Sequence, residues 1–195
     1  MKINNLFKNT IFTFLINTIF SIYNLILGIS THSWWFLTTG VYYSVLSLNR
    51  LVVISAKDRK KKFSIKLCSG IILMLVAVPL AGMVILSSVK DRGIKYNEIV
   101  MITISLYTFV KMTLAIINLV KIKGRNSRTL VTLKNISLAD AFVSVFSLQR
   151  SMVVTFEGMT ENEIRIMNIF TGSAVCIIVF LLGLNLVCSK NKLEE

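Results

Sequence analysis

Two charged residues lie inside stretches of the chain that are otherwise almost free of charge, and these two side chains have the clearest potential for chemistry. Lys111 falls within residues 99–120, and Asp140 falls within residues 135–156. A charged side chain at the centre of a membrane-spanning helix costs about 2.5 to 3.5 kcal/mol, and pairing with an opposite charge would offset that penalty. The sequence therefore predicts that Lys111 and Asp140 pair, either as a static link between two helices or as the gate or site of a polar path.

Uncharged polar side chains follow the same helical spacing as these charges. Positions three or four residues apart share one face of a helix. A polar face that pointed into lipid would be penalised, so such a face is expected to contact another helix or to line a cavity. Both interpretations stay open at this point. The candidate lining residues are Asn17, Ser21, Asn24, Ser44, Ser47, Tyr107, Lys111, Asp140, Ser144 and Ser147.

One short segment of the chain occurs twice. SVLSLNR ends at Arg50, and SVFSLQR ends one hundred residues later at Arg150. Around them, residues 40–55 and 140–155 are identical at six of sixteen aligned positions. We expect Arg50 and Arg150 to extend to the headgroup layers on opposite sides of a membrane, or to attract anions at the two mouths of a path.

The elements that carry these residues are predicted to be transmembrane helices. Of the 195 residues, 54% are hydrophobic and only 16% are charged. Residues 9–49 contain no charge, which suits two spans joined by the turn GISTHSWW, and residues 67–89 and 166–189 each suit one span of about 20 residues. Together with 99–120 and 135–156, they predict an all-α integral membrane protein with six transmembrane helices.

The repeated segment belongs to a wider internal similarity. The first predicted helix matches the fourth at an offset of ninety residues, with Thr18 over Thr108, and CSGII at the start of the third helix faces FTGSA in the sixth. We predict a single membrane domain, residues 1–195, made of two three-helix repeats at about 1–95 and 96–195. Because three is an odd number, the second repeat would be inverted relative to the first, as in many transporters.

The positive charge of the chain is concentrated between the predicted helices. Lys and Arg total 22 against 9 Asp and Glu, which gives a formal net charge of +13. Most of the excess follows the second and fourth helices, and Lys2 and Lys8 precede the first. The positive-inside rule then predicts that both termini are cytoplasmic, and we expect the membrane to be a bacterial-type plasma membrane. The basic loops would meet anionic lipid headgroups, so we expect no nucleic-acid partner.

The sequence contains none of the common catalytic motifs. It lacks H-E-x-x-H, a P-loop and G-x-S-x-G. The single histidine, His32, lies beside Trp34 and Trp35, a group typical of an interfacial belt rather than of a metal site. We therefore expect neither an enzyme nor a cofactor or metal, and a primary ATP-driven pump in one chain is excluded.

These patterns favour a secondary transporter or channel for an ion or a small polar solute. The alternative is a non-catalytic membrane subunit that docks onto a larger complex, including a substrate-binding component of an importer. The expected partners are the lipid bilayer, the solute or ion, and either a second copy of the chain or another membrane protein.

Overall fold

The computed structural model describes residues 2–30, 32–55, 62–89, 98–122, 128–155 and 158–188. Each of these ranges is built around one helix, which confirms the all-helical prediction. The helices are α1 (Lys2–Ser30), α2 (Trp34–Ser55), α3 (Lys62–Val89), α4 (Glu98–Ile122), α5 (Arg128–Thr155) and α6 (Glu161–Cys188). Basic residues expected to set the topology that lie outside the described residues are Lys57, Arg59, Lys60, Lys61, Lys123 and Arg125.

A tight turn joins α1 to α2 where the sequence predicted one. The Ser33 amide donates to the Gly28 carbonyl at 3.2 Å, and His32 adopts a left-handed backbone with a φ of 49°. A methyl group on Gly28 would lie 2.7 Å from the Leu37 amide nitrogen, so glycine allows the two helices to approach at this point. The two tryptophans that follow differ: Trp34 is 67% exposed, whereas Trp35 is buried, so only Trp34 is placed as the expected belt requires.

Helix α6 begins several residues before the predicted span because its first turn is capped. The Thr160 amide and hydroxyl both donate to Glu163 Oε2 at 2.8 Å, and the Glu163 amide donates back to Thr160 Oγ1 at 3.4 Å. This is a reciprocal capping box, which satisfies amide groups that the first turn leaves without a helical partner. The cap allows polar residues to extend the helix beyond its apolar part.

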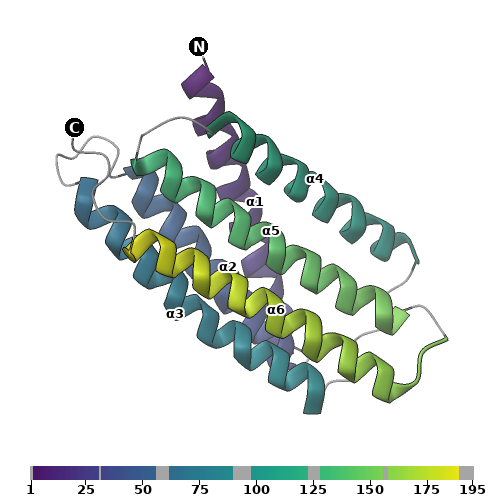
Figure 1. Cartoon of the computed structure of the whole chain (residues 1–195). Helices are drawn as coiled ribbons and strands as arrows, with labels where there is room; N and C mark the ends of the chain where they lie inside the picture. The colour runs from purple at the N-terminus through teal and green to yellow at the C-terminus, as the bar shows by residue number, and fades with distance from the viewer. Residues whose placement is uncertain are drawn as a thin grey trace.

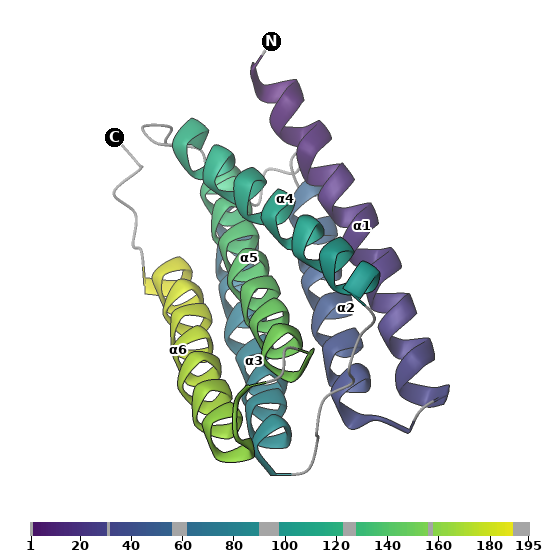
Figure 2. The same ribbon diagram turned by 90° about the vertical axis from the view of Figure 1, so that its right-hand side faces the viewer.

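The six helices form one bundle in which successive helices run in opposite directions (Figures 1 and 2). Helix α1 begins at the same end of the bundle at which α6 ends. The closest packing joins α3 to α6 and α1 to α2, and α4 packs mainly on α5. Helices α1 and α4 contact each other at only a few points, and α4 is tilted relative to α5 at the edge of the bundle (Figure 2).

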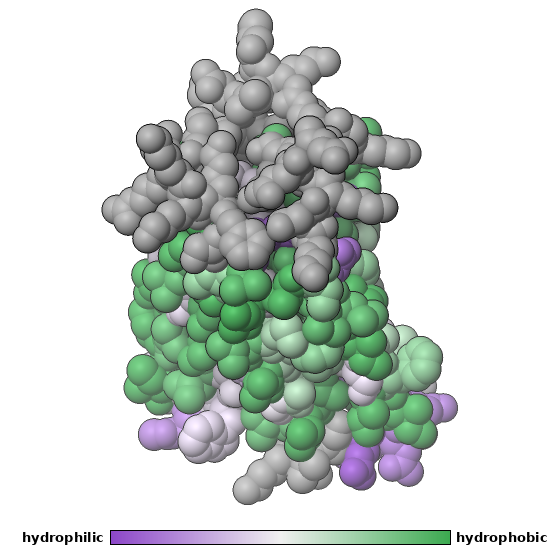
Figure 3. Space-filling model, turned by 60° about the vertical axis from the view of Figure 1, so that its left-hand side comes forward, coloured by the Kyte–Doolittle hydropathy of each residue, from purple (hydrophilic) through white to green (hydrophobic). Residues whose placement is uncertain are grey.

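Five of the six helices are long and apolar enough to cross a membrane, so the protein is a polytopic integral membrane protein. In α4 the apolar stretch within the described residues is shorter, Ser105–Ile117, and the sixth predicted span is not shown. Large apolar side chains point outward, among them Phe170 on α6, which is 79% exposed. Apolar side chains cover the middle of the face in Figure 3, and hydrophilic ones gather at its lower margin.

The interior of the bundle combines an apolar core with a polar centre. Side chains of α2, α3, α5 and α6 form the core, which includes Leu46, Leu80, Phe146 and Val179. Four charged side chains are buried among the described residues: Arg50, Lys111, Asp140 and Arg150. The first three meet in the polar centre, to which α1, α2, α4 and α5 contribute.

Candidate functional site

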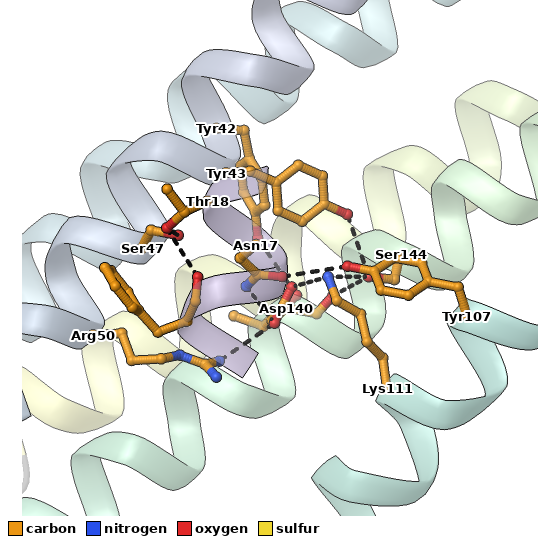
Figure 4. A network of polar contacts seen from close by, with 12 residues as sticks. Asn17, Thr18, Tyr42, Tyr43, Ser47, Arg50, Tyr107, Lys111, Asp140 and Ser144 are labelled. Carbon is orange, nitrogen blue, oxygen red and sulfur yellow. Dashed lines mark hydrogen bonds and ion pairs between the residues drawn. The ribbon is translucent and has the colours of Figure 1, made fainter. Parts of the chain in front are cut away.

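Asp140, on α5, is the centre of a polar cluster to which four helices contribute (Figure 4). Its Oδ1 accepts a hydrogen bond from Lys111 Nζ of α4 at 2.7 Å. Its Oδ2 accepts from Asn17 Nδ2 of α1 at 2.8 Å and from Arg50 Nη2 of α2 at 3.3 Å. The expected pairing of Lys111 with Asp140 is therefore present in the structure. A carboxylate with three donors, two of them cationic, has the surroundings of an ionised group.

Lys111 has further partners that suit an ammonium group. Its Nζ donates to Ser144 Oγ at 3.2 Å and lies 4.5 Å from the centre of the Tyr43 ring and 4.9 Å from that of Tyr107. Aromatic faces attract cations through their electron density, and this attraction is stronger where water is excluded. The Lys111 side chain is 4% exposed, so its charge is held by these neighbours and not by solvent.

The seam between α1 and α4 is closed by two contacts beside the cluster. Tyr107 Oη donates to Asn17 Oδ1 at 3.5 Å, at the long end for a hydrogen bond. The rings of Tyr107 and Phe20 lie 5.6 Å apart. Asn17 thus links the seam to Asp140, because its amide nitrogen binds the carboxylate and its amide oxygen faces Tyr107.

Arg50 is buried, which corrects the expectation that it extends to the headgroup layer. The residue is 1% exposed and its guanidinium turns inward to Asp140, which lies ninety residues away in the sequence. The buried Arg50 Nε has no hydrogen-bond partner. The expectation failed because the sequence does not show that a carboxylate of another helix lies within reach.

Arg150 is also buried, but its surroundings differ from those of Arg50. It is 5% exposed, and its guanidinium carbon lies 3.5 Å from the centre of the Trp35 ring, a stacked arrangement typical of arginine on an aromatic face. Because α2 and α5 run in opposite directions and each arginine lies near the C-terminal end of its helix, Arg50 and Arg150 lie toward opposite ends of the bundle. Both side chains are buried between helices.

A second, uncharged set of contacts joins α1 to α2. Ser21 Oγ donates to the Gly40 carbonyl at 2.8 Å and lies 2.6 Å from Ser44 Oγ. Thr18 Oγ1 lies 3.5 Å from Ser47 Oγ. These residues were predicted as lining, and the structure places them between two helices, with no described residue of the charged cluster among their partners.

Two other predicted lining residues lie outside the cluster. Asn24 Nδ2 donates to the Phe20 carbonyl of its own helix at 2.7 Å, and the buried Ser147 Oγ has no hydrogen-bond partner. Of the ten predicted lining residues, the structure thus brings five together around one carboxylate. These are Asn17, Tyr107, Lys111, Asp140 and Ser144.

The sequence analysis missed the tyrosine pair beside this cluster. Tyr43 Oη lies 3.3 Å from Ser144 Oγ, and Tyr42 Oη donates to the Ala139 carbonyl at 3.5 Å. Both tyrosines are almost fully buried. The sequence offered one signal for them: they directly precede Ser44, the first residue of the repeated segment. Without that position, an aromatic residue in an apolar helix is explained by packing alone.

Around Asp140, the buried charges of the described residues do not balance. Arg50 and Lys111 carry two positive charges, and Asp140 carries one negative charge. No group of three or more His, Cys, Asp or Glu side chains among the described residues could hold a metal ion. The arrangement can hold or exchange a charged or strongly polar group.

No family model, curated protein or solved structure matches this chain, so what it does has to be argued from the charged cluster and from the bundle around it.

Proposed function

We propose that this protein is a secondary transporter or channel for an ion or small polar solute, with the Asp140 cluster as its site or gate. The observation that carries the proposal is the convergence of two buried cationic side chains, Arg50 of α2 and Lys111 of α4, on one carboxylate of α5 at mid-length of a membrane bundle. Ionisable groups at such depth are penalised and mark ion or substrate paths in membrane proteins. A static link between helices would need only one cation.

Related contacts in the two halves support inverted repeats as the basis of transport. Between α3 and α6, a methyl group on Gly70 would lie 3.0 Å from Leu186 Cβ, and one on Gly172 would lie 2.5 Å from Val84 Cγ2. An offset of 102 residues relates α3 to α6, so that Gly70 corresponds to Gly172 and Val84 corresponds to Leu186. Under this correspondence, the contact of Gly70 with Leu186 becomes the contact of Gly172 with Val84. Any antiparallel helix pair gives reciprocal contacts, so the support for a repeat at a pseudo-twofold axis comes from glycine at both positions, Gly70 and Gly172.

The serine contacts of α1 and α2 add a second correspondence. Ser21 precedes Lys111 by ninety residues, and Gly40 and Ser44 precede their counterparts in α5 by one hundred. In both halves, the first helix of the repeat uses one side chain to reach two positions, four residues apart, on the second helix. Exchange of conformation between two such halves converts an outward-open site into an inward-open one.

The seam between α1 and α4 is the part of the bundle best suited to open. These helices touch at only a few points, and the Tyr107 contacts to Asn17 and Phe20 close the seam directly beside Asp140. Parting of α4 from α1 would expose the carboxylate and both cations without disturbing the packed pair α3 and α6. In this proposal α4 is the sixth span, both termini are cytoplasmic, and the protein has no catalytic activity.

The direct test is flux into proteoliposomes that contain the purified protein, under an imposed proton or sodium gradient. We expect flux in the wild type and its loss in Lys111→Met and Asp140→Asn, each checked for folding by size-exclusion chromatography. Lys134→Met is the matched control, because Lys134 lies on α5 outside the cluster and is partly exposed. A stoichiometric protein partner that always co-purifies, with no flux for any ion or common solute, would favour a docking subunit instead.

A further inference from the structure

The buried cluster carries more positive than negative charge, and this bears on the class of substrate. Arginine is permanently charged in proteins. Lys111 has a carboxylate at 2.7 Å and two aromatic faces beside it, and Asp140 accepts from three donors. With Arg50, Lys111 and Asp140 all ionised, the cluster has a net charge of +1 in an interior shielded from water.

We infer that the cluster is a binding site for a small monoanion, which joins Arg50 and Lys111 and makes the site electrically neutral. The inference rests on the proposed transport function and names its substrate class. A halide and a monocarboxylate share the required chemistry, a single negative charge that can accept several hydrogen bonds. Asp140 acts as the built-in counter-ion that holds the two cations when the anion is absent.

The anion would bind the N–H donors of Arg50 that Asp140 does not fully satisfy. Arg50 reaches Asp140 through Nη2 alone at 3.3 Å, the longest of the three contacts to that carboxylate, and its buried Nε has no partner. A guanidinium binds carboxylates best through two parallel N–H groups, so Arg50 has unused capacity for a bidentate partner. Exchange of Arg50 from Asp140 to an incoming anion would satisfy Nε as well.

A cation is disfavoured at the same place. Both Asp140 oxygens already accept from cationic or amide donors, and an incoming cation would meet Arg50 and Lys111 at close range. A hard cation such as sodium binds several oxygens at once. The oxygens nearby are a serine hydroxyl and tyrosine hydroxyls that already face other partners, so the cluster does not supply such a cage.

The first experiment measures the thermal unfolding midpoint of the purified protein in detergent while sodium acetate, sodium chloride or sodium sulfate is titrated. A ligand that binds the folded state raises the midpoint in a saturable way, which yields a dissociation constant. We expect saturation with acetate or chloride, the same result with the choline salt of that anion, and weaker binding of sulfate. A shift that follows sodium and not the anion overturns the inference.

Variants then separate the roles of the three charges. Arg50→Gln and Lys111→Met each make the cluster neutral, and we expect anion affinity to fall at least about thirtyfold. Arg165→Gln and Lys134→Met remove the same types of charge at exposed or partly exposed positions outside the cluster, and they should leave affinity unchanged. Asp140→Asn removes the competing carboxylate, so anion affinity should rise by about tenfold.

The Asp140→Asn result is decisive because a cation site would lose affinity for its ligand when the carboxylate is removed, whereas the anion site should gain affinity. Loss of all ligand binding in Asp140→Asn overturns the anion assignment. If Lys111→Met folds poorly, the double variant Lys111→Met with Asp140→Asn keeps the +1 charge on Arg50, and it should bind the anion again. Failure of this double variant to bind, when it is folded, also overturns the inference.

Flux measurements distinguish failure of the inference from failure of the transport function. Flux of a cation or a neutral solute without anion binding would leave the transport function in place and overturn the monoanion. Anion binding that depends on Arg50 and Lys111, without flux of that anion, would support the site and overturn transport. Anion flux that Arg50→Gln abolishes would support both.

Discussion

The helix pairs α1–α2 and α4–α5, one in each half of the chain, build similar contacts with different chemistry, and the pair in the first half gives the neutral version. Ser21 of α1 donates to the Gly40 carbonyl at 2.8 Å and lies 2.6 Å from Ser44 Oγ. These contacts are short and carry no charge. They do what serine commonly does in membrane helices, which is to join two helices by hydrogen bonds.

In the second half of the chain, the contact between α4 and α5 is made by charged side chains. Lys111 of α4 reaches Asp140 Oδ1 at 2.7 Å and Ser144 Oγ at 3.2 Å on α5, and Asp140 draws in Arg50 from the other half. The comparison teaches that the backbone frame fixes where two helices meet, whereas side-chain identity decides whether the meeting point is a plain contact or a charged centre. The predictions below alter one half or the other.

The largest effect is expected when the charged centre loses its carboxylate. Asp140→Ala leaves Arg50 and Lys111 without a negative partner in the interior. Removal of one partner of a buried ion pair destabilises a protein by about 3 to 5 kcal/mol. The free energy of unfolding, measured by titration of a denaturing detergent into mild micelles, should fall by this amount. A loss below about 1 kcal/mol would show that Asp140 does not hold the cations.

A charge-reversal pair tests whether Lys111 and Asp140 act on each other directly. Either Lys111→Asp or Asp140→Lys alone places like charges in contact, and both should unfold readily. Together they restore an opposite-charge pair, so the double variant should be more stable than the sum of the singles by about 2 kcal/mol. Additive losses in the same detergent titration would contradict the direct pairing.

In the neutral half, the expected sensitivity is to volume and not to charge. A methyl group at position 40 would lie 2.7 Å from Leu25 Cγ and 3.0 Å from the Leu25 amide nitrogen. Gly40→Ala should therefore destabilise by about 1 to 2 kcal/mol through overpacking. Gly82→Ala is the matched control, because nothing lies within 4 Å of a methyl group there, and it should be neutral or slightly stabilising.

The smallest effect compares the two serines at corresponding positions. Ser44→Ala removes a hydrogen bond between neutral groups, which in membrane proteins averages about 0.6 kcal/mol. Ser144→Ala removes an acceptor of Lys111 and should cost more, about 1.5 kcal/mol, since bonds to charged groups are stronger. Equal losses in the two variants would mean that the Lys111 contact to Ser144 contributes nothing.

The course of the helices followed from hydropathy and charge. The turn after α1 lies within GISTHSWW, where a charge-free stretch was too long for one span, and α2 begins at Trp34, inside that segment. Helix starts were less accurate, because α5 begins at Arg128 and α6 at Glu161, before their apolar parts. Polar residues extend a helix when capping groups or exposed backbone satisfy its first amides, and hydropathy does not register this.

The candidate site was predicted in part. Burial penalties alone indicated that Lys111 and Asp140 needed each other, and helical spacing brought Asn17, Tyr107 and Ser144 into the set. The position of Arg50 could not be predicted, because an arginine near a helix end suits a headgroup as well as a buried partner. Whether Arg50 extends to a headgroup or binds Asp140 depends on the distance between α2 and α5.

The sequence by itself determined that the chain is helical, membrane-embedded and charged at two interior positions, because lipid penalises exposed backbone and isolated charge whatever the packing. Only the tertiary structure decided that Arg50 joins Lys111 on one carboxylate while Arg150 stacks on Trp35. The physical reason is that charge balance in the interior is a sum over side chains from different helices, and that sum depends on distances between helices that no sequence spacing fixes.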